Sequence, residues 1–301
     1  MGLFDPATHT LSEVGDTISG GLMKYSGGVL LPGGRVVFVP YGADKVGVFN
    51  PAARTFSLVG DTISTTSTTE LKFRGGVLLP SGKVAFVPSS ADKVGIFDPA
   101  TDTFSFVGDT VSGTNKYAGG VLLPSGKIVF VPHLADNVGV FDPATDTFST
   151  VIPTATISSY SGGVLLPSGK VLFVPYSAEK VGIFDPATDT LALVGDTIIP
   201  GEDKYNAGVL LPNGLVVFVP EKADNVGVFD PTTNTFSRVG PDLSGDYEHR
   251  GGVLLPSGKV AFVPHMSGFV AVFDPGSAAP AYTVEGGVPD AWRPLLSPHS
   301  F

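Results

Sequence analysis

The chain contains no cysteine, and several other residue types that carry chemistry are scarce. It has five histidines, three methionines and one tryptophan among 301 residues. The lack of cysteine excludes disulfides, thiolate metal sites and a cysteine nucleophile, and it leaves the redox compartment undecided. No apolar run approaches the roughly 20 residues that a membrane-spanning helix needs.

Basic residues are also few, with 18 Lys and Arg against 28 Asp and Glu and a net charge of −10. Nucleic acids and anionic membrane surfaces are bound by faces rich in Lys and Arg. We therefore expect no nucleic-acid partner and no membrane insertion. Residues Met1 to Pro6 already belong to a repeat, so no signal peptide is expected.

Glycine and proline are abundant, and they mark a repeat. The stretch GGVLLPSG at residues 119–126 recurs six times with small changes, at intervals of 43 to 48 residues. Its proline falls at Pro32, Pro80, Pro124, Pro167, Pro212 and Pro256. A repeat of this length that contains only strand signals predicts an all-β fold. We expect a six-bladed β-propeller of four-stranded antiparallel blades.

The third repeat shows the expected blade. Strand A is Gly120–Leu123, strand B is Lys127–Val131, strand C is Val138–Phe141 and strand D is Thr147–Val151. Strands B and C are almost wholly apolar, which indicates burial on both faces. The phenylalanines of strands B and C are therefore predicted to be core: Phe38, Phe86, Phe130, Phe173, Phe218, Phe262, Phe49, Phe97, Phe141, Phe184, Phe229 and Phe273.

The ends of the chain suggest how the propeller closes. We assign residues 1–275 to the propeller, with repeats beginning near residues 24, 72, 116, 159, 204 and 248, and residues 276–301 to a proline-rich tail. Residues 1–16 form a closing half-repeat, in which Leu11 to Val14 offers the outer strand that the sixth repeat lacks. The tail holds Trp292 and is a possible contact with an assembly partner.

The turn FDPATDTFS, in Phe97 to Phe104 and Phe141 to Phe148, resembles the kelch repeat, and the likeness extends over most of the chain. Two features depart from it, because Val131-Pro132 replaces the kelch double glycine and Phe148 replaces its tryptophan. The GGVLLPSGKVVFVP hairpin also looks like propeller repeats of phage virion proteins. The resemblance implies a binding module, although the galactose-oxidase group of kelch-like proteins are enzymes.

The repeats differ from one another mainly before strand A and after strand B. Tyrosine and arginine are favoured in protein interfaces. We therefore expect a binding surface for a protein or glycan receptor there. Its candidate residues are Lys24, Tyr25, Phe73, Arg74, Lys116, Tyr117, His133, Tyr160, Tyr176, Lys204, Tyr205, His249, Arg250 and His265. Two alternatives stay open: the loops have drifted without function, or the aromatic residues are a packing lid.

The loops between strands B and C also carry acidic residues, at Asp44, Asp92, Asp136, Glu179 and Asp224. Carboxylates around a channel mouth can hold a cation, but an aspartate in a turn more often caps that turn. The equivalent His133 and His265 belong to opposite blades, too far apart to share a metal. We therefore assign no metal and no cofactor.

Sequence motifs for catalysis are absent: there is no nucleophile elbow, no HExxH and no phosphate-binding glycine loop. The sequence therefore favours a non-enzymatic binding or structural module, in a setting such as a virion fibre or spike head. An intracellular kelch-like adaptor is one alternative. A lectin or enzyme with an axial small-molecule pocket is another.

Overall fold

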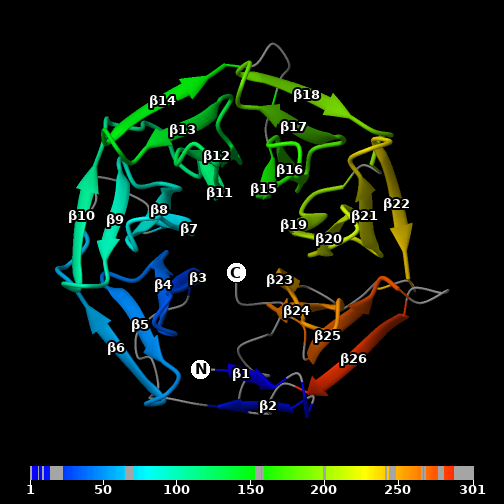
Figure 1. The fold of residues 1–301 in the computed structure, drawn as a ribbon, viewed down its shortest axis with the longest axis horizontal. Coiled ribbons are helices and arrows are strands. Elements are labelled where there is room, and N and C mark those ends of the chain that lie inside the picture. The colour runs from blue at the N-terminus through cyan, green and yellow to red at the C-terminus, as the bar shows by residue number, and fades with distance from the viewer. Residues whose placement is uncertain are drawn as a thin grey trace. The chain divides into compact units, whose positions relative to one another are not determined.

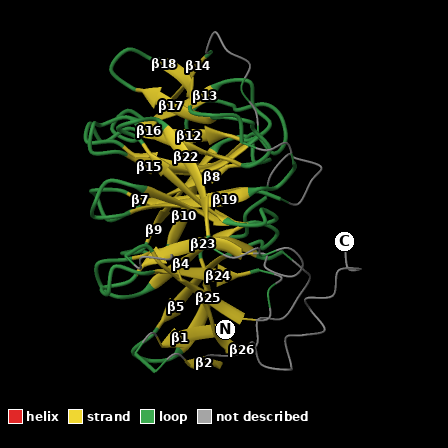
Figure 2. Ribbon diagram, turned by 90° about the vertical axis from the view of Figure 1, so that its right-hand side faces the viewer, coloured by secondary structure: helices red, strands yellow, loops and turns green. Residues whose placement is uncertain are grey.

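The computed structural model describes residues 2–5, 7–8, 10–13, 23–64, 71–152, 157, 159–198, 201–240, 243, 249–265, 267, 269–276 and 281–287. Within these ranges the chain forms strands and turns, and it contains no helix (Figure 2). No helix of this described part is long and apolar enough to cross a membrane.

Six four-stranded antiparallel sheets form the blades of a β-propeller, as the repeat predicts (Figure 1). The first strands are β3 (Tyr25–Leu30), β7 (Phe73–Leu78), β11 (Tyr117–Leu122), β15 (Tyr160–Leu165), β19 (Tyr205–Leu210) and β23 (His249–Leu254). The second strands are β4 (Val36–Pro40), β8 (Val84–Pro88), β12 (Ile128–Pro132), β16 (Val171–Pro175), β20 (Val216–Pro220) and β24 (Val260–Pro264).

The third strands are β5 (Val46–Asn50), β9 (Val94–Asp98), β13 (Val138–Asp142), β17 (Val181–Asp185), β21 (Val226–Asp230) and β25 (Phe269–Asp274). The fourth strands are β6 (Thr55–Val59), β10 (Thr103–Val107), β14 (Thr147–Val151), β18 (Thr190–Val194), β22 (Thr235–Val239) and β26 (Ala281–Gly287). A separate hairpin pairs β1 (Gly2–Asp5) with β2 (Thr10–Glu13). We number the blades one to six in chain order.

The first strand of each blade begins about three residues earlier than the sequence indicates. In blade three, Tyr117 pairs with Pro132, and the register then shifts before Gly120 pairs with Phe130. Gly119 lies in this β-bulge at φ +98°, a conformation that L side chains rarely adopt. The bulge therefore places the aromatic residue inside the sheet instead of in the loop before it.

The two uniform turns of each blade are explained by backbone geometry. In blade three, the Asp142 side chain accepts a hydrogen bond of 3.0 Å from the backbone N–H of Ala144. Asp146 then takes φ +54°, which Asp and Asn tolerate better than most residues. In the other turn, the Gly126 N–H donates to the Leu123 carbonyl, with Gly126 at φ +86°. Folding alone accounts for the constancy of these residues.

The contacts divide the chain into two units, which we describe separately. Unit one consists of residues 14–161 and 185–191, and it holds blades one to three. Unit two consists of residues 2–13, 162–184 and 192–301, and it holds blades five and six and the β1–β2 hairpin. The strands of blade four are shared between the two ranges.

Within each unit, neighbouring blades pack through a repeated contact of glycine with valine. A Cβ built on Gly76 of blade two would lie 2.9 Å from Val29 and 2.8 Å from Val39 of blade one. In unit two, Gly252 of blade six meets Val209 and Val219 of blade five in the same way. Only glycine allows the first strand to approach this closely.

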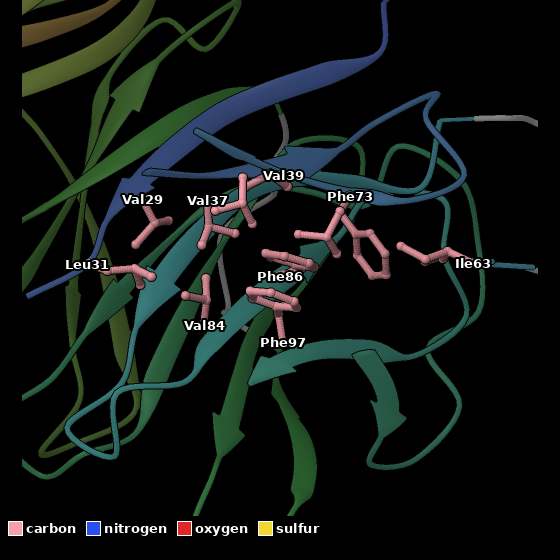
Figure 3. Close-up of a cluster of buried hydrophobic side chains, with 12 residues drawn as sticks. Val29, Leu31, Val37, Val39, Ile63, Phe73, Val84, Phe86 and Phe97 are labelled. Carbon is pink, nitrogen blue, oxygen red and sulfur yellow. The ribbon is translucent and has the colours of Figure 1, made fainter. Parts of the chain in front are cut away.

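The core lies between successive blades. Figure 3 shows one cluster, in which Val37 and Val39 of blade one lie beside Phe73, Phe86 and Phe97 of blade two. The predicted core phenylalanines are buried, which confirms that prediction, except that Phe38 is half-buried. Burial of such side chains is the main favourable term in forming a blade.

The predicted closure of blade six is wrong. Its fourth strand is β26, which pairs with β25 along Asp274 to Phe269, so the tail assigned to residues 276–301 contributes a strand. Leu11 lies in β2, which pairs with β1 instead. Both the half-repeat and the stretch after Asp274 could supply this fourth strand. The stretch that directly follows β25 in the chain supplies it. Trp292 lies outside the described residues.

Candidate functional site

We call the start of the first strand and the turn between the second and third strands the variable end of a blade. In blade three this end consists of Lys116 to Ala118 and His133 to Asn137. The sequence predicts a binding surface from these positions. The structure places the fourteen candidates in three different environments.

The aromatic candidates of the first strands lie inside the blades. Phe73, Tyr117, Tyr160, Tyr205 and His249 are at most 2% exposed, and Tyr25 is half-buried. In four of them, Tyr25, Phe73, Tyr117 and Tyr205, the ring covers a glycine of the third strand. A Cβ on Gly139, for example, would lie 3.0 Å from the Tyr117 ring. Burial raises the pKa of Tyr117, Tyr160 and Tyr205, and that of Tyr25 to about 12. These side chains pack the blade and are not exposed to a partner.

Lysines precede most of the aromatic residues, and the side chains of two of them connect neighbouring blades. Lys116 Nζ donates to the carbonyls of Ala91 at 2.8 Å and Gly113 at 2.7 Å, and Lys72 Nζ lies 2.9 Å from the Asp44 carboxylate. Lys204 Nζ donates to the Gly201 carbonyl at 2.9 Å. Burial lowers the pKa of Lys116 to about 8, against a smaller opposing effect of Asp92. Lys116 and Lys204 are buried structural residues, and Lys24 is half-buried.

The acidic residues of the turns take part in the fold through their backbone. The backbone carbonyls of Asp44, Asp92, Glu179 and Asp224 accept hydrogen bonds from residues that follow the fourth strand of the same blade. Among the described residues, no group of three or more His, Asp or Glu side chains is arranged to hold a metal ion.

Three polar residues from successive blades meet in unit one. Arg74 of β7 lies 3.2 Å from His133 Nε2 and donates to the Ser161 hydroxyl of β15 at 3.4 Å. His133 Nδ1 lies 3.1 Å from the Tyr160 carbonyl oxygen. A carbonyl only accepts and a guanidinium only donates. His133 is therefore neutral, with its proton on Nδ1 and its Nε2 lone pair directed at Arg74.

In this Arg74 cluster (Arg74, His133 and Ser161), the side chains are held by hydrogen bonds and two of them are partly exposed to solvent. Ser161 is 3% exposed, whereas Arg74 and His133 are half-buried. The bond to a backbone carbonyl fixes the orientation of the imidazole. The three residues together carry the positive charge of the guanidinium. Such a group can bind a carboxylate or phosphate through charge-assisted hydrogen bonds.

A second polar cluster occurs in unit two, around Arg250 and Glu221. Arg250 Nε and Nη2 donate to Glu221 Oε1 at 2.9 and 2.6 Å, and Asn206 donates to Glu221 Oε2 at 2.8 Å. Glu221 is 2% exposed. Arg250 is thus matched by a buried carboxylate, although it occupies the same strand position as Arg74.

An ion pair lies next to this cluster. Lys222 Nζ is 2.6 Å from Asp203 Oδ2. Burial alone would raise the pKa of Asp203, but hydrogen bonds from Lys222 and Tyr176 outweigh it, and the pKa is lowered. Tyr176 and His265, the remaining predicted residues, are half-buried.

Sequence reasoning missed several members of the two clusters. Ser161, Asn206, Glu221, Asp203 and Lys222 were not among the candidates. Glu221 and Lys222 differ in type from the residues at the same positions in other repeats, and that difference was the available signal. Ser161 carried none, because Ser26 occupies the same position in blade one.

Two grooves lie away from these clusters, at the opposite, uniform ends of the blades. One groove of about 460 Å³ in unit one is lined by Pro80, Lys83, Ser125 and Asp142. Its counterpart in unit two, about 500 Å³, is lined by the equivalent Pro167, Lys170 and others. Because the same turn residues line both, the grooves arise from the repeat itself.

No protein-family model matches the chain, and no curated protein matches it in sequence. Solved structures do resemble it. A virginiamycin B lyase from Staphylococcus aureus is 12% identical, with a TM-score of 0.70 over 86% of this chain and 84% of that one. A streptogramin B lyase is 17% identical, with a TM-score of 0.65 over 78% and 74%. A copper-bound fungal alcohol oxidase of the AA5 family is 15% identical, with a TM-score of 0.64 over 87% and 65%.

These likenesses show the β-propeller fold, and they correct one expectation. The absence of common catalytic motifs predicts that the chain is not an enzyme. The similar structures overturn that inference, because the same fold occurs in a lyase and in an oxidase that are 12% and 15% identical to this chain. The kelch-like and virion attributions receive no support from the similar structures.

Proposed function

We propose that the chain is a ligand-binding β-propeller that recognises an acidic group, a carboxylate or a phosphate, at the Arg74 cluster. The observation that carries this proposal is the meeting of Arg74, His133 and Ser161 at hydrogen-bonding distance. They come from three successive blades, at the end where the repeats diverge. No turn or packing requirement of the repeat calls for this combination.

The chemistry of the cluster favours an anion. A guanidinium binds planar or tetrahedral oxyanions through paired N–H donors. The hydroxyl of Ser161 is a further donor, and its burial removes competing water.

The direct test is a titration with inorganic phosphate, and separately with acetate, in which the imidazole resonances of His133 are monitored by NMR. We expect a saturable shift of these resonances with each anion that binds. Arg74→Gln should weaken binding at least tenfold, about 1.4 kcal/mol. Lys83→Gln is the control, because it removes the same charge at the uniform end of the same blade.

A glycan array then distinguishes the sources of the acidic group. Retention of sialylated or uronic-acid glycans, lost in Arg74→Gln, identifies a carboxylate on a sugar. Phosphorylated glycans retained in preference identify a phosphate. Equal binding by Arg74→Gln and the parent chain in both experiments would rule out recognition at this cluster.

A second candidate is catalysis at the same cluster. His133 is held as a neutral imidazole with an Nε2 lone pair, the state that a general base requires. One similar structure is that of a catalytically inactive histidine-to-alanine variant of virginiamycin B lyase with quinupristin. The test is incubation of the chain with quinupristin, followed by chromatography. Consumption that is lost in His133→Ala supports this candidate, and an unchanged substrate rejects that activity.

A further inference from the structure

The β1–β2 hairpin has the structure of half a blade. Phe4 pairs with Leu11 and Asp5 with Thr10, as Phe141 pairs with Phe148 and Asp142 with Thr147 in blade three. Its turn is built identically, with the Asp5 side chain accepting from the Ala7 N–H at 2.9 Å. These strands correspond to the third and fourth strands of a blade, and within the described residues the hairpin pairs with no first or second strand.

The hairpin also packs as half a blade. Phe4 lies against Ala261, Val270 and Val272 of blade six. In unit one, Phe141 lies in a cluster with the equivalent residues of blade two, Ala85, Val94 and Ile96. The half-blade therefore covers the third strand of blade six, as blade three covers the third strand of blade two.

The rest of this face of blade six is exposed. Val253 of β23 is 55% exposed and Val263 of β24 is 46% exposed. Their equivalents in blade two, Val77 and Val87, are 6% and 0% exposed, because Gly120 and Ile128 of blade three cover them. The exposed valines thus mark the position of a first and second strand that the half-blade lacks. We call Val253, Val263 and the edge of β1 the open face.

We propose that the open face binds a β-hairpin of another polypeptide, one with the chemistry of this repeat's own first and second strands. Four blade contacts in the chain specify that chemistry: a glycine faces the two valines, at Gly76, Gly120, Gly208 and Gly252. A β-branched second strand completes the contact, as Ile128 does in blade three. The partner's second strand hydrogen-bonds along Gly2–Asp5, as β12 does along β13.

The residues of this chain after Gly287 do not have this chemistry. Pro289, Pro294 and Pro298 interrupt any ladder of hydrogen bonds, because proline has no N–H to donate. Added strands are a known mode of recognition, in which main-chain bonds give affinity and alternate side chains give specificity. The open face presents both an edge and an apolar surface for that mode.

The test uses a synthetic peptide with the sequence of residues 117–132 as the probe, added to the complete chain. We expect saturable binding, with slower amide hydrogen exchange at Gly2–Asp5. A peptide with Gly120→Leu is the matched control, since its side chain collides with the two valines. Val253→Asp should weaken binding at least tenfold. Leu58→Asp, at a position 56% exposed in blade one, should leave binding unchanged.

Two results would overturn the proposal. One is an equal affinity of the parent chain for the two peptides, or an equal affinity of Val253→Asp and the parent chain for the unchanged peptide. The other is slow exchange at Gly2–Asp5 before any peptide is added, which would mean that the chain or a second copy of it already covers the open face.

Discussion

Gly95 shows how one residue sets the interior of a blade. A Cβ on it would lie 2.7 Å from the Phe104 ring and 2.9 Å from the Phe73 ring. The first-strand ring therefore occupies the volume that a third-strand side chain would fill. The same relation recurs for Tyr117 with Gly139 and for Tyr205 with Gly227. The first-strand ring therefore fits because the third strand has a glycine at the position that the ring covers.

We expect Gly95→Ala to destabilise the fold by about 1–3 kcal/mol, the usual cost of overpacking a core. Gly33→Ala is the control, because no atom lies within 4 Å of its Cβ position and its φ is not in the left-handed region. That change should stay within about 0.5 kcal/mol. Urea denaturation measures both. Equal midpoints for the two variants would contradict the packing of Phe73 over Gly95.

Lys116 gives a pH-dependent contribution. Its folded-state pKa is about 8, below the ordinary value of 10.5. Between these values the unfolded chain binds more protons, so this residue makes stability rise with pH from about 8 to 10.5. We expect the free energy of unfolding of the parent, relative to Lys116→Met, to increase between pH 7.5 and 9.5. A difference that is flat or falls over this range would contradict burial of a titrating amine.

At the scale of an element, the turn between β20 and β21 is held to β23 by a charge pair. Glu221 is buried, and it accepts from both Arg250 and Asn206. A buried pair of this kind costs desolvation to form. Removing one partner therefore lowers the free energy of unfolding more than removing both partners does. The strand position that carries Arg74 in unit one is used here for structure.

Arg250→Ala should destabilise the fold by about 1–3 kcal/mol, because a buried carboxylate loses its charged partner. Adding Glu221→Leu should recover most of that loss, since no buried charge is left unpaired. Lys222→Ala, which removes an exposed ion pair, should cost no more than about 1 kcal/mol. Thermal denaturation of the three variants measures these effects. Additive losses in the double variant would show that Glu221 is not buried as described.

At the scale of the whole molecule, the number of blades and the strand order follow from the repeat alone. Six prolines at near-constant spacing and apolar second and third strands specify them. The candidate site was predicted less well. Tyr117 belongs to the first strand through a bulge that leaves no mark except Gly119. The Arg74–His133 contact joins residues that are distant in sequence, which a repeat pattern cannot reveal.

The closing strand provides the prediction at this scale. A chain that ends at Gly276 lacks β26, so the edge of β25 is exposed and the protein should aggregate. A chain that ends at Gly287 keeps β26 and should remain as soluble as the parent. Light scattering after size-exclusion chromatography compares them. If both truncated chains behave like the parent, β26 is not needed to complete blade six.

The uniform hairpins of the blades have a consequence for how the chain reaches its fold. The sequence LLPSGK joins the first and second strands at residues 78–83, 122–127, 165–170 and 254–259. A hairpin can therefore pair with the third strand of a neighbouring repeat at nearly the same local energy as with its own, which is frustration in the energy-landscape sense. Refolding from denaturant offers all these mispairings at once. Synthesis on the ribosome removes most of them, because each hairpin meets its own third strand before the next repeat exists.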